Sequence, residues 1–256
     1  MIHPTAIIHP SAQLGAQVSV GPYSVIGEHV EIGDGCVIGP HVVIEGHTRI
    51  GCANRIFQFC SIGAEPQDKK YAGEPTRLEI GDGNTIHEFC SIHIGTAQDN
   101  GVTRIGSDNW IMAYVHIAHD CAVGDHTVFA NNATLAGHVM VGDWAILGGF
   151  TAVHQFVRVG AHSFCGINAI LVQDVPPYIT VAGVPAAPHG INSEGLKRRG
   201  FGAETISEIK RAYRLLYRSH LPLQEAITQI QQIAETQPAL RIMETFLAHK
   251  GRGIIR

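Results

Sequence analysis

The residues best suited to acid–base chemistry are concentrated between positions 116 and 155. They comprise imidazoles, one carboxylate, one glycine and one amide: His116, His119, Asp120, Gly137, His138, His154 and Gln155. A neutral imidazole can take a proton from a hydroxyl near neutral pH, and a glycine N–H can hydrogen-bond a developing oxyanion. These residue types together suit the transfer of an acyl group to a hydroxyl.

The same side chains allow other interpretations. The spacing of His116 and His119 could ligate zinc, and a γ-type carbonic anhydrase would need three convergent histidines. A third interpretation is a scaffold without catalysis, in which each imidazole is an ordinary surface group. Which interpretation holds depends on the elements that position these residues.

Those elements follow from a repeat with a period of six. Every sixth residue from Ile8 to Ile62 is aliphatic, and the series resumes from Ile80 to Ile92. It shifts by one residue and then runs from Ile105 to Leu171, where Phe129 and Cys165 are the departures from aliphatic character. A period of six fits neither an α-helix nor a simple alternating strand.

Short strands joined by tight turns do fit this period, with three strands making one triangular coil of 18 residues. Stacked coils pair as parallel strands about 4.8 Å apart, and their aliphatic residues form ladders inside the prism. The 29 glycines and the 7% aromatic content agree with such a core of small repeated units. We therefore predict a mainly β protein whose residues 1–190 form a parallel β-helix.

In such a prism, residues 18 apart stack on adjacent coils as a column. His119, Gly137 and Gln155 then share one column, and Asp120 and His138 share the next. This arrangement places a base beside a glycine amide. Because no histidine takes an inward position of the repeat, we expect the histidines to be accessible.

Two segments interrupt the repeat and are predicted to leave the prism as loops. They are residues 63–78, the first loop, and residues 94–104, the second loop, which place Asp68, Glu74 and Gln98 where aliphatic residues would stand. Loops on a rigid scaffold often carry function. We expect these two to contribute to a site.

The pattern changes after Leu171, where a segment rich in Pro, Ala and Gly runs to Gly190. Apolar residues at helical spacing follow and predict a helical domain over residues 191–256. The predicted stripes are Ile206, Ile209, Tyr213, Leu216 and Tyr217; Ala226, Ile230 and Ile233; and Leu240, Met243 and Leu247. Three helices should therefore fold back on the prism or on a neighbour.

Composition narrows the function further. The formal net charge of −4, with no basic tract in the first 190 residues, argues against nucleic-acid binding. The residues after Met1 show neither a secretory leader nor a membrane span, so we expect a cytoplasmic protein. The six cysteines form no CxxC motif, which argues against a zinc knuckle or a disulfide framework and favours small buried thiols.

Five segments resemble the UDP-N-acetylglucosamine O-acyltransferases, a hexapeptide-repeat family that acts first in lipid A biosynthesis. They are QDKKYAGEPTR at residues 67–77, HIAHDC at 116–121, ANNATLAGHV at 130–139, GINSEGLKRRGF at 190–201 and RGIIR at 252–256. The resemblance spans essentially the whole chain. Many unrelated transferases share the hexad, whereas these motifs are specific, and a coenzyme A-dependent transferase of small acyl groups is the alternative.

The resemblance implies a left-handed helix and a homotrimer with active sites between neighbouring prisms. It implies transfer of a 3-hydroxyacyl chain from acyl carrier protein to the glucosamine 3-hydroxyl of UDP-N-acetylglucosamine, without metal or bound cofactor. His119 would be the general base, Gly137 the oxyanion donor and Asp120 the support of the imidazole. The substrate-binding residues would be Asp68, Lys70, His116, His138, His154, Gln155, Asn192, Glu194, Arg198 and Arg199.

Ile167 departs from relatives that carry glycine at the far end of the acyl groove. It lies 48 residues beyond His119, or about 2.7 coils, which corresponds to about 13 Å. We expect this bulky residue to limit the transferred acyl chain to about ten carbons, the length that fits this distance. Exposed basic residues from Lys197 to Arg218 would face the acidic carrier protein, and the sequence leaves a 3-amino sugar nucleotide open as the acceptor.

Overall fold

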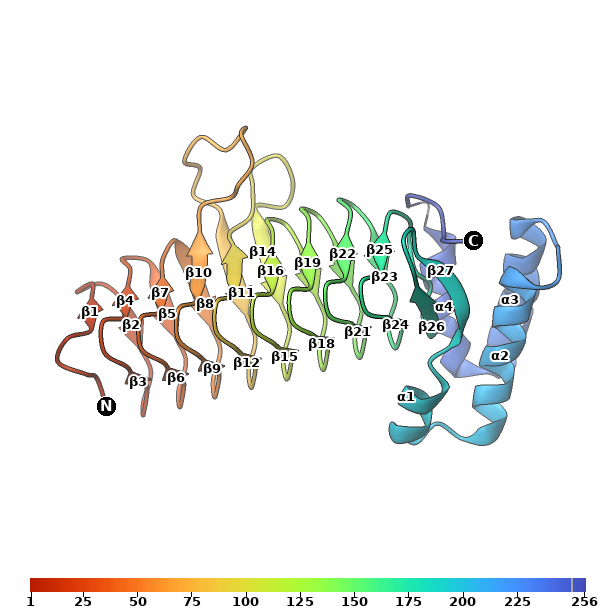
Figure 1. Ribbon diagram of the computed structural model, residues 1–256, viewed down its shortest axis with the longest axis horizontal. Coiled ribbons are helices and arrows are strands. Elements are labelled where there is room, and N and C mark those ends of the chain that lie inside the picture. Colours follow the sequence, from red (N-terminus) through yellow and green to blue (C-terminus); the bar gives the residue numbers. More distant parts are fainter. Residues whose placement is uncertain (250) are drawn as a thin grey trace.

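The computed structural model describes residues 1–249 and 251–256. Its strands form an elongated three-sided prism, with the helices gathered at the C-terminal end (Figure 1). The first sheet contains β1 (Ile7–Ile8), β4 (Val25–Ile26), β7 (Val43–Ile44), β10 (Ser61–Ala64), β13 (Ser91–His93), β16 (His116–Ile117), β19 (Thr134–Leu135), β22 (Ala152–Val153) and β25 (Ile170–Leu171).

The other two faces of the prism are built in the same way. The second sheet contains β2 (Gln13–Leu14), β5 (Val30–Ile32), β8 (His47–Ile50), β11 (Arg77–Ile80), β14 (Val102–Ile105), β17 (Ala122–Val123), β20 (Met140–Val141) and β23 (Arg158–Val159). The third contains β3 (Ser19–Val20), β6 (Val37–Ile38), β9 (Arg55–Ile56), β12 (Thr85–Ile86), β15 (Trp110–Ile111), β18 (Val128–Phe129), β21 (Ile146–Leu147), β24 (Phe164–Cys165), β26 (Ile179–Ala182) and β27 (Ala187–Ile191).

The register of the strands confirms the 18-residue coil. Ile117 pairs with Leu135, and Leu135 pairs with Val153, in parallel ladders. The predicted inward residues from Val20 onward are buried, while Ile8 and Leu14 at the N-terminal end are half-buried. The prediction of a left-handed parallel β-helix is confirmed by this topology and by the solved structures described below.

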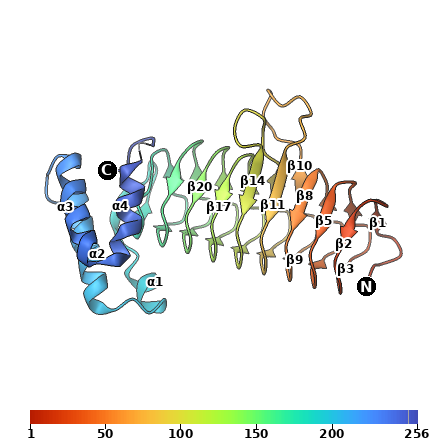
Figure 2. The ribbon, with the colours of Figure 1, turned by 180° about the vertical axis from the view of Figure 1, so that it is seen from behind.

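Both interruptions leave the prism at one edge, between the first and second sheets (Figure 1, Figure 2). Residues 65–76 connect β10 to β11, and residues 94–101 connect β13 to β14. Across these coils, Ser61 pairs with Ser91 and Ser91 with His116, so the parallel pairing continues through two longer coils, with one register shift between Ile62 and Ala64.

The prism does not stop at Leu171. Cys165 pairs with Val181, so one further, shortened coil adds the strand β26 to the third sheet in parallel. β27 then pairs antiparallel with β26 and leads into the helices. The turn of the shortened coil contains Pro176 and Pro177, whose missing N–H groups suit a position outside the ladder.

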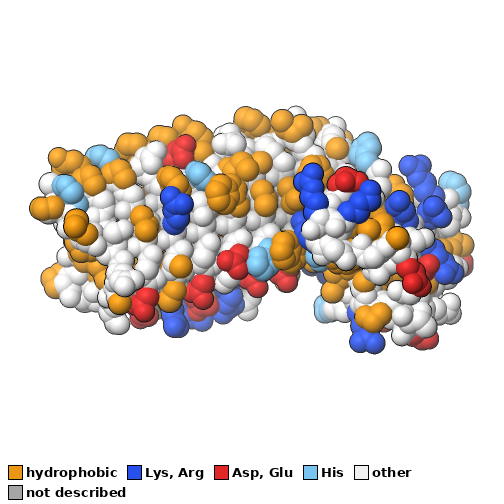
Figure 3. All heavy atoms as spheres, turned by 90° about the horizontal axis from the view of Figure 1, so that it is seen from below, with side chains coloured by type: hydrophobic (Ala, Val, Ile, Leu, Met, Phe, Trp, Pro, Cys, Tyr) orange, Lys and Arg blue, Asp and Glu red, His pale blue; other side chains and the backbone are white. Residues whose placement is uncertain are grey.

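The three predicted helices are present, and a short helix precedes them. The helices are α1 (Ser193–Arg198), α2 (Ala203–Tyr217), α3 (Leu223–Thr236) and α4 (Arg241–Ala248), with a 3₁₀ turn η1 at Pro238–Leu240. Their apolar stripes are largely buried, and basic side chains gather on the exposed surface of this end of the molecule (Figure 3). Among the described residues, no helix is long and apolar enough to cross a membrane.

All six cysteines are free. Five are buried as expected, but Cys52 is exposed, because it occupies an outward turn position between β8 and β9.

A buried ion pair attaches the C-terminal segment to the prism. Asp174 is fully buried, and its Oδ2 accepts hydrogen bonds from Arg158 Nη2 at 2.7 Å and Nε at 2.9 Å. The same guanidinium donates to the carbonyl oxygens of Phe246 and His249, and it lies 4.3 Å from the centre of the Phe246 ring. One charged group of the prism therefore contacts both the last coil and α4.

Replacing Asp174 by Asn should lower the free energy of unfolding by about 3 kcal/mol, because Arg158 would lose its buried counter-charge. Thermal or urea unfolding of the two proteins measures the difference. Glu235→Gln, which neutralises an exposed carboxylate on α3, is the matched control and should change the free energy by less than about 0.5 kcal/mol. Equal effects of the two substitutions would contradict this assignment.

Candidate active site

The column predicted through His119 and Gly137 is present at the edge between the first and second sheets. A Cβ added to Gly137 would lie 2.5 Å from His119 Cε1, so the imidazole ring rests directly on the glycine. The His138 N–H donates to the His119 carbonyl oxygen at 3.0 Å, which joins the two coils at this turn. Glycine at 137 is therefore required by the packing of the ring.

His119 is paired with Asp120. The distance from His119 Nδ1 to Asp120 Oδ2 is 2.8 Å, which leaves Nε2 as the ring nitrogen turned away from the carboxylate. This hydrogen bond favours the tautomer with its proton on Nδ1, so that Nε2 carries the lone pair. The pair has the geometry of an imidazole base oriented by a carboxylate.

The expectation that the histidines are accessible is wrong for His119 and His93, which are each 6% exposed. The second loop explains the burial at His119, because its residues contact both Asp120 and His138 at this edge. The first loop contributes to the burial of His93, whose Nδ1 lies 2.7 Å from the Glu65 carbonyl oxygen.

Asp120 is held by the second loop. Its carboxylate accepts hydrogen bonds from the Thr96 N–H and from Thr96 Oγ1, the latter at 2.6 Å. Burial by itself would raise the pKa of the Asp120 carboxyl, but the hydrogen bonds from His119 and Thr96 outweigh burial and hold this pKa below its usual range. The carboxylate is therefore ionised next to His119 at neutral pH.

His138 forms a second imidazole–carboxylate pair. Its Nδ1 lies 2.7 Å from Asp99 Oδ2 on the second loop, and its ring meets that of His119 edge-on at a centroid distance of 5.0 Å. The His138 ring also stacks on the Phe156 ring, with a distance of 4.4 Å between the ring centroids. No sequence motif marks Thr96, Asp99 or Phe156 as site residues, although two of them lie in the predicted second loop and Phe156 is one coil beyond His138.

His116 lies on the neighbouring strand, with Nδ1 2.8 Å from Ser91 Oγ. Burial, together with smaller effects of the positive charges on the neighbouring imidazoles His93 and His119, lowers the pKa of His116 to about 4. His116 is therefore neutral at physiological pH. His154 and Gln155, one coil beyond Ala136 and Gly137, are both exposed on the same edge.

The remaining predicted binding residues lie elsewhere in this chain. Asp68 and Lys70 contact each other in the first loop, where the Lys70 N–H donates to Asp68 Oδ1. No hydrogen bond or ion pair within the described residues joins either of them to His119.

The group near residue 192 belongs to the helical end. Asn192 accepts a hydrogen bond from the Gly195 N–H and so caps α1, while Glu194 pairs with Lys197. Arg198 is exposed. Arg199 lies over the Trp144 ring and donates to the Trp144 carbonyl oxygen. These residues form a basic corner of the prism that is separate from His119.

Ile167 projects from the prism and is 74% exposed. The turn that carries Ile167 stacks on the turns one and two coils earlier. The Asn168 N–H donates to the Gly149 carbonyl oxygen, and the Phe150 N–H donates to the Asn131 carbonyl oxygen. An isoleucine this exposed within one chain is available to a ligand or a neighbouring chain.

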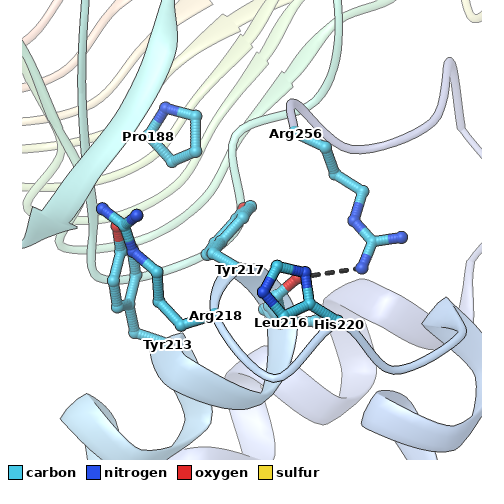
Figure 4. Close-up of a pocket in the computed structure, with 7 residues that line it drawn as sticks. All are labelled: Pro188, Tyr213, Leu216, Tyr217, Arg218, His220 and Arg256. Atoms are coloured by element: carbon cyan, nitrogen blue, oxygen red, sulfur yellow. Dashed lines mark hydrogen bonds between the residues drawn. The ribbon is translucent and has the colours of Figure 1, made fainter.

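The residues around His119 lie at one edge of the prism, and two cavities of the structure are lined by other residues. The cavity at the helical end has a volume of about 290 Å³ and is lined by Pro188, Tyr213, Leu216, Tyr217, Arg218, His220 and Arg256 (Figure 4). A second cavity of about 610 Å³ lies beneath the first loop, beside Glu45, Tyr71 and Glu74. None of the predicted site residues lines either cavity.

Within the described residues, one group of side chains brings possible metal ligands together, and it is formed by His119, Asp120 and His138. His116, considered above as a zinc ligand with His119, does not belong to it. The Nδ1 atoms of both imidazoles already face carboxylates, which fits oriented bases.

A parallel β-helix with an oriented imidazole over a glycine amide defines the class of hexapeptide-repeat acyltransferases. Residues 11–46 and 103–137 match the model of the bacterial transferase hexapeptide, described as six repeats. Residues 174–255 match domain 2 of UDP-N-acetylglucosamine O-acyltransferase.

The chain belongs to the UDP-N-acetylglucosamine O-acyltransferase family. It is 62% identical over 255 residues to the acyl-[acyl-carrier-protein]–UDP-N-acetylglucosamine O-acyltransferase of Thiobacillus denitrificans, with 100% of this chain and 99% of the relative covered. The corresponding protein of Herminiimonas arsenicoxydans is 61% identical over 260 residues, with the same coverage. The resemblance found in the sequence is thereby confirmed.

Solved structures support the same assignment. The UDP-N-acetylglucosamine O-acyltransferase of Moraxella catarrhalis superimposes with a TM-score of 0.97 at 46% identity, covering 100% of this chain and 99% of that one. The UDP-N-acetylglucosamine acyltransferase of Francisella novicida gives 0.98 at 44% identity, covering 100% and 94%.

Replacing Gly137 by Ala should lower kcat by about 100-fold, because the new methyl group would displace the His119 ring from its position. Steady-state transfer assays and a thermal unfolding curve measure activity and folding separately. Gly202→Ala adds a methyl group where no other atom lies within 4 Å and should retain full activity. Unchanged turnover of the Gly137 variant would show that the ring position does not matter.

Proposed function

We propose that this protein transfers a 3-hydroxyacyl chain from acyl carrier protein to the glucosamine 3-hydroxyl of UDP-N-acetylglucosamine, with His119 as the general base. The observation that carries the proposal is the buried His119–Asp120 pair resting on Gly137. The names of the relatives supply the donor and acceptor classes.

The reaction follows from this geometry. His119 Nε2 takes the proton of the sugar hydroxyl while the hydroxyl oxygen attacks the thioester carbonyl carbon. The negative charge that develops on the carbonyl oxygen needs a hydrogen-bond donor. Among the described backbone hydrogen bonds, the Gly137 N–H has no acceptor, and it lies next to the ring. The intermediate collapses with cleavage of the carbon–sulfur bond, and the imidazolium returns its proton to the carrier thiolate.

The charge distribution supports this division of roles. Asp120 is ionised and hydrogen-bonded to His119 Nδ1, so it stabilises the imidazolium that forms during the reaction. His116 is neutral and keeps Nε2 free for a hydrogen bond with substrate. All of these steps use the side chains and backbone of the protein, and the proposal requires no metal or bound cofactor.

We further propose that the active protein is a homotrimer whose neighbouring prisms close the site. In one chain His154 and Gln155 are exposed at the edge where His119 is buried, and the first loop and the basic corner near Arg199 are separate from them. A neighbour could supply Asp68 and Lys70, or Asn192, Glu194, Arg198 and Arg199. Such guanidinium groups suit a diphosphate because they form paired, charge-assisted hydrogen bonds.

Replacing His119 by Ala should leave folding and assembly intact and lower transfer by about 100- to 10,000-fold, the usual cost of losing a general base. The assay combines labelled UDP-N-acetylglucosamine with a series of 3-hydroxyacyl carrier proteins, and acetyl-coenzyme A is tested in parallel. Transfer from acetyl-coenzyme A alone would identify a small-acyl transferase instead. Near-normal activity of the variant would place the base elsewhere.

The length of the transferred chain should be limited by Ile167. The residue lies about 13 Å along the prism from His119, which is room for an extended chain of about ten carbons. Ile167→Gly should therefore shift the preferred donor toward longer chains, measured as kcat/KM across the carrier series. The same chain-length profile in both proteins would refute this role, and Val172→Gly, another exposed aliphatic residue, serves as the control.

A further inference from the structure

The second loop brings one fully buried threonine against the carboxylate of the catalytic pair. Thr96 is 0% exposed, and its N–H lies 3.0 Å from Asp120 Oδ1 and 3.1 Å from Oδ2. Its hydroxyl donates to Asp120 Oδ2 at 2.6 Å. This Oδ2 is the same atom that faces His119 Nδ1, so Thr96 and His119 share one carboxylate oxygen.

The backbone around Thr96 is fixed from several directions. The Gly95 carbonyl oxygen accepts a hydrogen bond from Thr76 Oγ1 at 2.6 Å, and the Gly95 N–H donates to the Arg77 carbonyl oxygen. A Cβ at Gly95 would lie 2.2 Å from the Val102 nitrogen, so the two ends of the loop touch. The end of the first loop thus supports the start of the second, and Thr96 has little freedom to move.

A second threonine holds the backbone of Asp120. The Asp120 N–H donates to Thr103 Oγ1 at 2.8 Å, and Asp120 adopts a left-handed conformation with φ of 58°. The carboxylate is therefore fixed at its backbone by Thr103 and at its oxygens by Thr96. The titratable groups near the His119–Asp120 pair are His116, His138 and, through His138, Asp99.

Loss of the Thr96 hydroxyl would remove one of the groups that offset the burial of a charge. A buried carboxylate without sufficient donors becomes protonated or turns toward other donors. In either case its hydrogen bond with His119 Nδ1 is weakened.

We propose that Thr96 is a positioning residue of the transferase reaction, which holds the Asp120 carboxylate in the orientation that fixes the tautomer and direction of His119. Thr96 acts through Asp120 and does not itself touch the reacting atoms. This inference rests on the function proposed above for His119. Through Thr96, a buried residue near its start, the second loop becomes part of the catalytic machinery.

The test compares Thr96→Val, Thr96→Ser and the loop control Gln98→Ala in the full-length protein. Thr96→Val should lower kcat by about 10- to 100-fold, the range expected for a hydrogen bond to a charged group. KM for the sugar nucleotide should stay within about twofold, because uniform binding is not affected. Thr96→Ser keeps the hydroxyl and should recover most of kcat, and Gln98→Ala, an exposed neighbour, should match the wild type.

A spectroscopic measurement separates positioning from general destabilisation. In ¹⁵N-histidine-labelled protein, the downfield proton on His119 Nδ1 reports the hydrogen bond to Asp120. This signal should be lost or shifted in Thr96→Val and present in Thr96→Ser and Gln98→Ala. Thermal unfolding of the same samples shows whether each variant is folded.

The two proposals fail in different ways. If His119→Ala keeps its activity, the proposed general base is wrong, whatever the Thr96 variants do. If His119→Ala is inactive but Thr96→Val keeps both kcat and the His119 Nδ1 signal, the positioning role of Thr96 is wrong. A rise in KM alone for a folded Thr96→Val, with an unchanged signal, would also overturn it.

Discussion

The structure depends on the lateral pairing of parallel coils in an 18-residue register. Ile117 stacks on Leu135 and Leu135 on Val153, and each of the three faces is built in the same way. Because side chains alternate between the two faces of a strand, a slip of one residue would turn an entire ladder from the core to solvent. The aliphatic ladders therefore fix the register, and the register fixes every turn.

The site is a consequence of that register. Turn residues one coil apart lie above one another, so an imidazole at 119 must share its space with the residue at 137. Glycine is the residue that leaves this space free. A rigid prism thus places the His119–Asp120 pair and Gly137 together at one edge.

The two loops supply contacts to the site that the repeat itself does not provide. In a regular coil most backbone N–H groups donate to the neighbouring coil, whereas the buried Asp120 carboxylate accepts its hydrogen bonds from His119 and from a loop residue. The second loop provides donors at Asp120 through Thr96, and it provides a carboxylate for His138 through Asp99. The loop therefore converts a column of turn residues into two oriented imidazole–carboxylate pairs.

The sequence by itself determined the β-helix, the coil length and the column that joins His119 to Gly137, because a strict period is local information that repeats along the chain. It also determined the three C-terminal helices, whose apolar stripes are visible in sequence. Tertiary structure alone decided that His119 and His93 are buried, that Asp99 faces His138 and that Asn192 caps α1. Those contacts involve loops and chain ends without a period, and their partners are set by where the folded prism places them.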